Sequence, residues 1–192
     1  MKRSYVMTAR AEAAQATAAR IFDAAMTRFL AAPYDEVRLD DIAADAGVSV
    51  QTVIRRFGSK EGLLRAMAAA EQERVAAERS GVTAADIPGA VENLLAHYER
   101  IGDTVLHILR QEQRVPVFGE ITDVGRKVHL GWCKEAFASY LDRRSGADRE
   151  RLLAQVVAVC DVYTWYLLRR QRGLSQRQTA LALTELLEGL LT

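Results

Sequence analysis

The sequence predicts an all-α protein. Nearly half of its 192 residues are apolar (49%) and only three are proline, which is enough to build a helical core. Apolar residues recur at helical spacing, and no stretch alternates with the period of two that marks a strand. We therefore expect about nine helices, divided between an N-terminal three-helix domain over residues 1–58 and a C-terminal helical domain over residues 59–192.

The N-terminal domain is expected to begin with a loose polar arm over residues 1–10 and a helix over residues 11–30. Pro33 ends this helix, and Tyr34 folds back as an apolar plug. The next helices cover residues 39–46 and 50–57. Gly47 supplies the turn between them, because a residue without Cβ adopts a positive φ easily. Ser49 is the expected N-cap of the third helix.

The remaining helices are expected to pack as antiparallel neighbours, because the breaks between them are short. A long fourth helix covers residues 60–79 and ends at a break over residues 80–86. Further helices are predicted over residues 87–101, 102–113, 121–143, 148–171 and 175–191.

Composition excludes several classes of protein. The net charge of +1 excludes a polycation, so any nucleic-acid binding depends on where charges lie. Two cysteines are too few for a disulfide scaffold, and no signal peptide is seen, which suits the cytoplasm. The apolar stretch over residues 152–168 is shorter than 18 residues and contains Gln155 and Asp161. It predicts a buried helix, and no membrane association.

Residues 39–64 have the pattern of a helix-turn-helix. Six apolar residues occupy the positions that a helix-turn-helix core requires: Ile42, Ala43, Ala46, Val48, Val53 and Phe57. Gln51, Thr52, Arg55 and Arg56 then point outward. An ordinary amphipathic hairpin with a solvated basic face is the alternative, but the small residue, the glycine and the capped basic helix together favour a DNA reader. Gln51 suits adenine and Arg55 suits guanine O6/N7, whereas Arg56 reaches phosphate or base, with phosphate favoured.

Residues 21–64 resemble the N-terminal domain of the TetR family of transcriptional regulators. The matching segments are IFDAA (21–25), Phe29, Tyr34, DIA (41–43), AGVS (46–49), Thr52, Phe57 and SKEGLL (59–64). The resemblance covers less than a quarter of the chain, and it implies that Ser49, Thr52 and Lys60 lie at the DNA, the last two on phosphate. Lys60 also stands at a helix N-terminus, which attracts anions.

Several residues depart from the family pattern. Gln51, Val53 and Ile54 occupy positions where the family often has glycine, leucine and tyrosine. Ile54 cannot donate the tyrosine's hydrogen bond to phosphate and is expected on sugar or on a thymine methyl. Arg38 replaces a capping threonine and is expected on phosphate instead, and Pro33 replaces a glycine. These departures leave the operator sequence open.

The C-terminal domain is expected to dimerise and to bind a ligand. Helix-turn-helix modules usually read two half-sites as dimers, and the resemblance implies pairing through the last two helices. The expected interface residues are Val156, Cys160, Tyr163, Leu167, Leu183 and Leu187. Family effectors bind in the helical body, where a pocket is expected to be apolar with a few polar groups. The expected lining residues are His97, Phe118, Trp132, Tyr140, Trp165 and Tyr166, although each alone is more often a core residue than a pocket residue.

Other titratable residues form no recognisable site. Asp161 lies in an apolar helix and, if buried, needs a tyrosine, an arginine across the dimer, or a ligand, with the structural roles favoured. His129 and Cys133, like Asp103 and His107, are spaced to share a helix face. Neither pair has a third metal ligand, so no metal and no cofactor are expected. No nucleophile motif, phosphate loop or HExxH is present, so no catalysis is expected.

Together these features predict a homodimeric repressor that binds double-stranded DNA at a palindromic operator. An unknown small hydrophobic or aromatic effector would release it by favouring a state in which the reading helices no longer match the half-sites. An activator, or a regulator without a ligand, is an alternative of the same class. A helical small-molecule carrier or enzyme, in which the N-terminal hairpin is only structural, is the alternative of another class.

Overall fold

The computed structural model describes residues 2–79 and 86–191, and their side chains from residue 12 onward. Throughout these residues the chain is helical, with no strand, which confirms the predicted fold class. The chain divides into two compact units, Met1–Glu71 and Gln72–Thr192, each described here by itself. The division falls within α4 (Lys60–Arg79), so the first unit extends past the expected boundary at residue 58.

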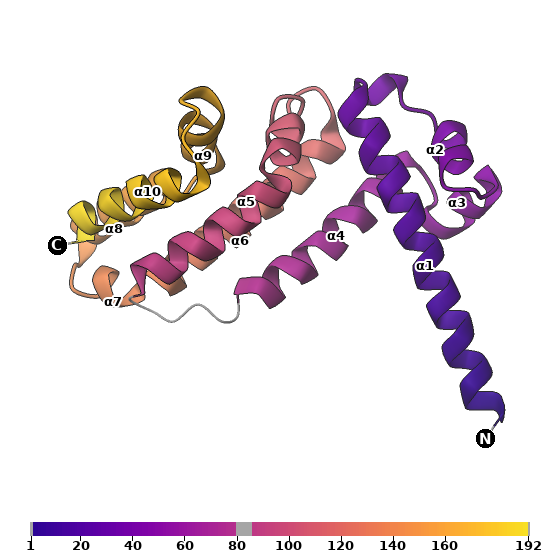
Figure 1. Cartoon of the computed structure of the whole chain (residues 1–192), viewed down its shortest axis with the longest axis horizontal. Coiled ribbons are helices and arrows are strands. Elements are labelled where there is room, and N and C mark those ends of the chain that lie inside the picture. Colours follow the sequence, from indigo (N-terminus) through magenta and orange to yellow (C-terminus); the bar gives the residue numbers. More distant parts are fainter. Residues whose placement is uncertain (1, 80–85, 192) are drawn as a thin grey trace. The chain divides into compact units, whose positions relative to one another are not determined.

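The first unit contains α1 (Lys2–Ala31), the 3-10 turn η1 (Tyr34–Glu36), α2 (Leu39–Asp45), α3 (Val50–Phe57) and the start of α4 (Figure 1). The expected loose arm is wrong, because α1 begins at Lys2. The physical reason is that residues 9–19 are rich in alanine and no proline or glycine precedes Pro33, so the helix that this stretch forms extends back to Lys2. Ile21, Ala25 and Phe29 form the buried face of α1, as the periodicity predicted.

The second unit contains α5 (Ile87–Leu109), α6 (Pro116–Ala136), α7 (Ala138–Leu141), α8 (Gly146–Val159), α9 (Val162–Tyr166), the π turn η2 (Leu167–Gln171) and α10 (Gln176–Leu191). Helix α10 packs on α5 and α8, and α6 packs on the same two helices. Their apolar faces enclose one core that includes Leu94, Leu95, Phe137, Val156 and Leu183.

Two predicted helix boundaries in this unit are wrong. The break expected at Gly102 does not exist, because α5 continues to Leu109. Gly102 is buried, and a Cβ placed on it would lie 2.5 Å from Cζ3 of Trp165. The glycine therefore permits the close approach of an indole ring. Helix α6 starts at Pro116 instead of residue 121, since proline is well suited to the first helical turn.

The third difference concerns Asp161. The predicted helix over residues 148–171 is broken after Val159, and Asp161 is the N-cap of α9, where its carboxylate accepts a hydrogen bond from Tyr163 N at 2.9 Å. The carboxylate is partly exposed, so the expectation of a buried acid is wrong. Asp161 therefore caps a helix, which is a structural role and not contact with a ligand.

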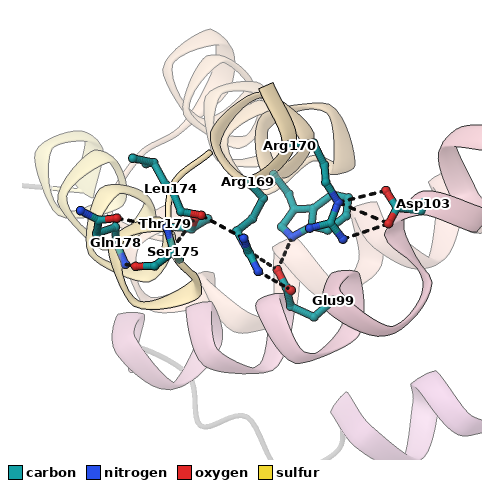
Figure 2. Close-up of polar contacts among 9 residues, drawn as sticks. Glu99, Asp103, Arg169, Arg170, Leu174, Ser175, Gln178 and Thr179 are labelled. Atoms are coloured by element: carbon teal, nitrogen blue, oxygen red, sulfur yellow. Dashed lines mark hydrogen bonds and ion pairs between the residues drawn. The ribbon is translucent and has the colours of Figure 1, made fainter. Parts of the chain in front are cut away.

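A polar network fastens η2 to α5 (Figure 2). Glu99 accepts hydrogen bonds from Trp165 Nε1 at 3.0 Å and from Arg169 Nε and Nη2 at 2.7 and 2.9 Å. These hydrogen bonds, of which those from Arg169 contribute most, hold the pKa of Glu99 below its ordinary value. Arg170 pairs with Asp103 at 2.9 Å, and Arg169 also donates to Leu174 O. The network thus fixes the position of the chain between α9 and α10.

Residues Gly146–Gln171 are long and apolar enough, by length and composition, to cross a membrane. A core helix of a soluble protein passes the same test, and only 28% of the apolar window is buried, less than the predicted buried helix requires. The stretch is also interrupted where Asp161 caps α9. This is weak support for a membrane span.

Candidate DNA-binding surface

Helix α3 is defined by caps at both ends. The Ser49 hydroxyl accepts a hydrogen bond from Thr52 N at 3.2 Å, and the two hydroxyl oxygens lie 2.9 Å apart. Gly58 ends the helix with φ +78°, a conformation that glycine adopts without the usual steric cost. The cap predicted at Ser49 is confirmed, and with it a side-chain hydrogen bond that orients Thr52 toward the start of the helix.

The inner face of α3 anchors it in the domain core. Val53 is fully buried, and Phe57 contacts Phe22 of α1 with ring centroids 5.6 Å apart. The predicted core residues Ile42, Ala43 and Ala46 are buried as well, whereas Val48 and Phe57 are half-buried. Packing of this kind fixes which residues α3 turns outward.

The outer face of α3 is basic and free. Gln51, Ile54, Arg55 and Arg56 are exposed, Ile54 to 47%. Among the described residues neither arginine is paired with a carboxylate. The Arg56 guanidinium lies 5.7 Å from the centre of the Phe57 ring. One amide, two guanidinium groups and one apolar side chain on a single helix face can contact base edges, methyl groups and phosphates in a major groove.

The turn before α3 is held by α1. Gly47 has φ +66°, which confirms the predicted turn, and Val48 N donates to Ala43 O at 3.0 Å. Arg20 Nε donates to Ala46 O at 3.2 Å and so satisfies a carbonyl at the end of α2. Arg28 forms two bonds to Asp45 at 2.6 and 2.9 Å. These contacts join α2 to α1 in addition to apolar packing.

Two residues in the first turn of α4 hold the loop after α1. Lys60 Nζ donates to Tyr34 O at 2.7 Å and Val37 O at 2.9 Å, and lies 4.0 Å from the centre of the Tyr34 ring. The Tyr34 hydroxyl donates to the Glu61 carboxylate. This bond lowers the pKa of Glu61 to about 2. Burial, more than the contacts with Glu61, raises the pKa of Tyr34. Lys60, expected on phosphate, therefore also has a structural role that its sequence context did not indicate.

Arg38 is placed differently from the other expected contacts. It occupies the N-cap position of α2 and makes no side-chain capping bond, as its replacement of threonine predicted. Its exposed guanidinium lies 3.8 Å from Asp40, too far for a hydrogen bond. Screening by solvent makes such a pair weak, so Arg38 is available to a phosphate.

The expected pocket residues fall into separate groups in the second unit. Phe118, Trp132 and Trp165 are buried, whereas His97, Tyr140 and Tyr166 are half-buried. His97 and Trp165 both contact Tyr98, at ring distances of 5.3 and 5.9 Å. Trp132 stacks on His129 at 6.1 Å. None of these six residues lines the open cavity that the second unit presents between α8 and α10.

The two pairs considered as metal ligands have different surroundings. His129 Nε2 lies 3.6 Å from Cys133 Sγ. Asp103 pairs with Arg170, and His107 Nε2 lies 2.8 Å from the side-chain nitrogen of Gln111. Among the described residues no group of three or more potential ligands is arranged to hold a metal ion.

Four of the six expected interface residues lie in the protomer's own core: Val156, Cys160, Leu183 and Leu187 are at most 1% exposed. They correct the expected interface, because the two helices are apolar on most sides and periodicity did not distinguish the inner from the outer stripe. Tyr163 and Leu167 are exposed, to 56% and 48%. Leu181 and Leu186 of α10, which periodicity did not single out, are exposed to 53% and 48% and belong to the outer face of the unit.

An open cavity of about 480 Å³ lies on this outer face, between α8 and α10. Its lining consists of apolar and small residues with a polar residue from each helix: Gln155, Ala158, Val159, Glu185, Leu186, Gly189 and Leu190. The methyl group of Ala158 and the absence of a side chain at Gly189 leave the backbone accessible here, and a Cβ on Gly189 would meet nothing within 4 Å.

Comparison with known proteins finds a family model that matches part of the first unit. Residues 21–67 match the model described as "Bacterial regulatory proteins, tetR family". No curated protein sequence matches the chain.

Three solved structures share the fold. GusR of Salmonella enterica is 21% identical with a TM-score of 0.67, and the alignment covers 91% of this chain and 95% of that one. A protein of Mesorhizobium loti MAFF303099 assigned to the TetR family has 16% identity, a TM-score of 0.65 and the same coverage. A protein of Pseudomonas aeruginosa PAO1 assigned as a transcriptional regulator has 17% identity, a TM-score of 0.67 and coverage of 90% and 89%.

Proposed function

Starting from a chain that is a DNA-binding transcriptional regulator with a tetR-family N-terminal domain, we propose that it is a homodimeric repressor released by a small-molecule effector. The observation that carries the DNA-binding half of this proposal is the outer face of α3. Gln51, Arg55 and Arg56 are exposed there on a helix capped at both ends. A rigid helix with unpaired cations on one face is suited to the major groove of double-stranded DNA.

Direct base readout is assigned to Gln51 and Arg55, and contact with sugar or a thymine methyl to Ile54. Phosphate contacts are assigned to Arg38, Thr52, Arg56 and Lys60, with Ser49 fixing the start of the helix. Lys60 already donates to two carbonyls, so its contribution is a positive charge near phosphate more than a new hydrogen bond. Phosphate contacts position the protein, and base contacts select the operator.

Dimerisation is assigned to the outer face of α8 and α10. The exposed Tyr163 and Leu167, which lie in the segment that joins these two helices, are assigned to the same interface. Leu186 and the cavity between α8 and α10 present apolar surface that water solvates poorly. A second copy of the same face would cover it and give the two-fold symmetry that a palindromic operator requires. We place the protein in the cytoplasm, with no catalytic role.

A gel shift with the promoter beside the protein's own gene tests DNA binding. We expect sequence-specific retardation by the wild type and its loss in Arg55→Ala/Arg56→Ala. Arg177→Ala, which removes an exposed arginine of α10, is the matched control and should bind normally. Lys60→Ala should weaken binding to every sequence and flatten the salt dependence by about one unit. Absence of retardation of any DNA at low salt would refute the proposal and favour a carrier or an enzyme.

Light scattering after size-exclusion chromatography tests the interface. We expect the wild type to have the mass of a dimer and Leu186→Glu to shift it toward the monomer, because a buried unpaired charge is costly. Val124→Glu is the control, since Val124 is exposed on α6 to 39%. A dimer that tolerates Leu186→Glu as well as Val124→Glu would contradict the assigned face.

A further inference from the structure

The second unit contains a half-buried cation, Arg79, that pairs with no carboxylate of the described residues. Arg79, the last residue of α4, places its guanidinium 4.9 Å from the centre of the Trp132 ring. Its Nε is fully buried and has no hydrogen-bond partner. Desolvation by burial lowers the pKa of Arg79 below its ordinary value. A buried charge of this kind is expensive for a protein to retain unless something pairs with it.

Other unsatisfied polar atoms surround this cation. Trp132 Nε1, His97 Nδ1 and His129 Nδ1 are also buried without partners. His129 stacks on Trp132. Burial, and next to it the nearby charge of Arg79, lowers the pKa of the His97 imidazole to about 3. His97 is therefore neutral at physiological pH. A buried polar atom without a hydrogen-bond partner destabilises the fold, so the concentration of several such atoms at one place requires an explanation.

Among the described residues, no carboxylate supplies the missing acceptor. The acidic groups that face Arg79 are Tyr98, Cys133, Cys160 and Glu78. The Tyr98 hydroxyl donates to Cys160 O, and Glu78 pairs with Arg100 at 2.8 Å. The remaining groups are two thiols, which are weak acceptors unless ionised. Contact with Cys160, and then with His129, lowers the pKa of Cys133 to about 6, so its thiolate is the one internal competitor.

We propose that Arg79, Trp132 and His97 form the recognition site for an effector that carries a carboxylate on a planar apolar body. The carboxylate pairs with the Arg79 guanidinium, whose planar array of donors matches two oxygens. The flat body lies against the Trp132 indole. The fixed positive charge of Arg79 favours an anionic ligand over a neutral one. This inference rests on the proposed regulation by an effector and specifies its chemical class.

The position of Arg79 connects this site to DNA binding. Arg79 ends the helix that Lys60 begins. The first turn of that helix, α4, holds the loop between α1 and α2 in the reading domain, which consists of α1, α2 and α3. A ligand that pairs with Arg79 stabilises whichever state of α4 presents the guanidinium to it. That differential affinity is what a ligand needs to shift the regulator between two states.

Calorimetric titration of the full-length protein with sodium benzoate and with its neutral analogue benzamide tests the site. We expect the wild type to bind benzoate about tenfold or more tightly than benzamide, since a charged hydrogen bond is lost in the amide. Arg79→Met should remove the preference. Arg143→Met is the matched control, because Arg143 also lies over an aromatic ring, at 5.3 Å from Tyr140, but is exposed. This control should keep the preference.

Several results would overturn the inference. These are no binding of benzoate by the wild type, equal binding of the two probes, or an unchanged preference in Arg79→Met. If Arg79→Met does not fold, the wild-type comparison decides alone. A preference for benzoate that appears only in Cys133→Ser would also overturn it, because the Cys133 thiolate would then be the natural partner of Arg79.

The gel shift separates this inference from the proposed function. Specific retardation of DNA without benzoate binding would overturn the inference and leave the repressor. Benzoate binding by a protein that retards no DNA would support the site and refute the repressor. Release of DNA by benzoate, and not by benzamide, would support both.

Discussion

Gly102→Ala tests whether the contact between α5 and the Trp165 indole limits the stability of the second unit. The added Cβ would lie 2.5, 2.7 and 3.0 Å from Cζ3, Cη2 and Cε3 of Trp165. Real Cβ atoms do not approach carbon this closely, so either the ring or α5 must move. The indole is 1% exposed, donates to Glu99 and lies under the Arg170 guanidinium at 4.6 Å, so it has little room to move.

The expected magnitude combines two opposing effects. Overpacking of a core costs about 1–3 kcal/mol, and the contact with three ring atoms places this site at the upper end. Alanine in place of a mid-helix glycine returns about 0.5–1 kcal/mol. The net destabilisation is therefore about 2 kcal/mol, which corresponds to a decrease in Tm of roughly 5–10 °C for a unit of this size.

Tryptophan fluorescence during urea or thermal unfolding measures this change in the relevant unit. Both tryptophans, Trp132 and Trp165, belong to the second unit. Gly125→Ala is the control, because Gly125 is also inside a helix, is exposed and would place its Cβ in open space. We expect this variant to be more stable than the wild type by about 0.5–1 kcal/mol.

A Gly102→Ala variant as stable as Gly125→Ala would refute the argument from close packing. A second-site test strengthens the comparison. Trp165→Phe removes the ring atoms that the new Cβ would meet, so Gly102→Ala should cost less in that background than in the wild type. Equal costs in the two backgrounds would show that the clash is not the cause.

Three further predictions follow from the reading domain and the α9 cap. Arg55→Ala should cost about 1–3 kcal/mol on the operator and relax specificity at one base pair; equal losses on operator and random DNA would exclude base reading. Tyr34→Phe should lower stability by about 1 kcal/mol near neutral pH. Because the folded pKa of Glu61 is about 2, below its ordinary 4.5, this difference should shrink as the pH falls from 4.5 toward 2 in circular-dichroism unfolding; a constant difference would contradict it. Asp161→Ala should destabilise the second unit by about 0.5–2 kcal/mol and Asp161→Asn by much less, as measured by tryptophan fluorescence; equal effects would argue against a cap.

The sequence predicted the helix-turn-helix formed by α2 and α3 accurately, because the signals that specify it are local. Gly47 and Ser49 each act on a turn within three residues of their own position, and both do what their residue types indicated. Val53 is buried, as its spacing required. The bonds from Lys60 to the carbonyls of Tyr34 and Val37 were not predictable, because they join residues more than twenty positions apart through backbone atoms.

The second unit was predicted less well, because several of its residues fit two different structural roles from sequence alone, and only tertiary packing decides between them. Gly102 reads as a helix break, but here it makes room for a ring that is distant in sequence. Asp161 reads as a buried acid in a long helix, but the helix is broken and the acid is its cap. Val156 and Leu186 belong to helices apolar on several sides, so spacing did not reveal which of the two faces inward.

The bonds made by the first turn of α4 determine how motion would reach the DNA. Lys60 and Glu61 bind both ends of the same short loop, which continues directly from α1 and leads into α2. A rotation of this turn therefore carries α1, α2 and α3 together as one rigid body. In the regulator proposed above, release from DNA would therefore require no distortion of the reading helix, because α1, α2 and α3 would move together with their internal geometry intact.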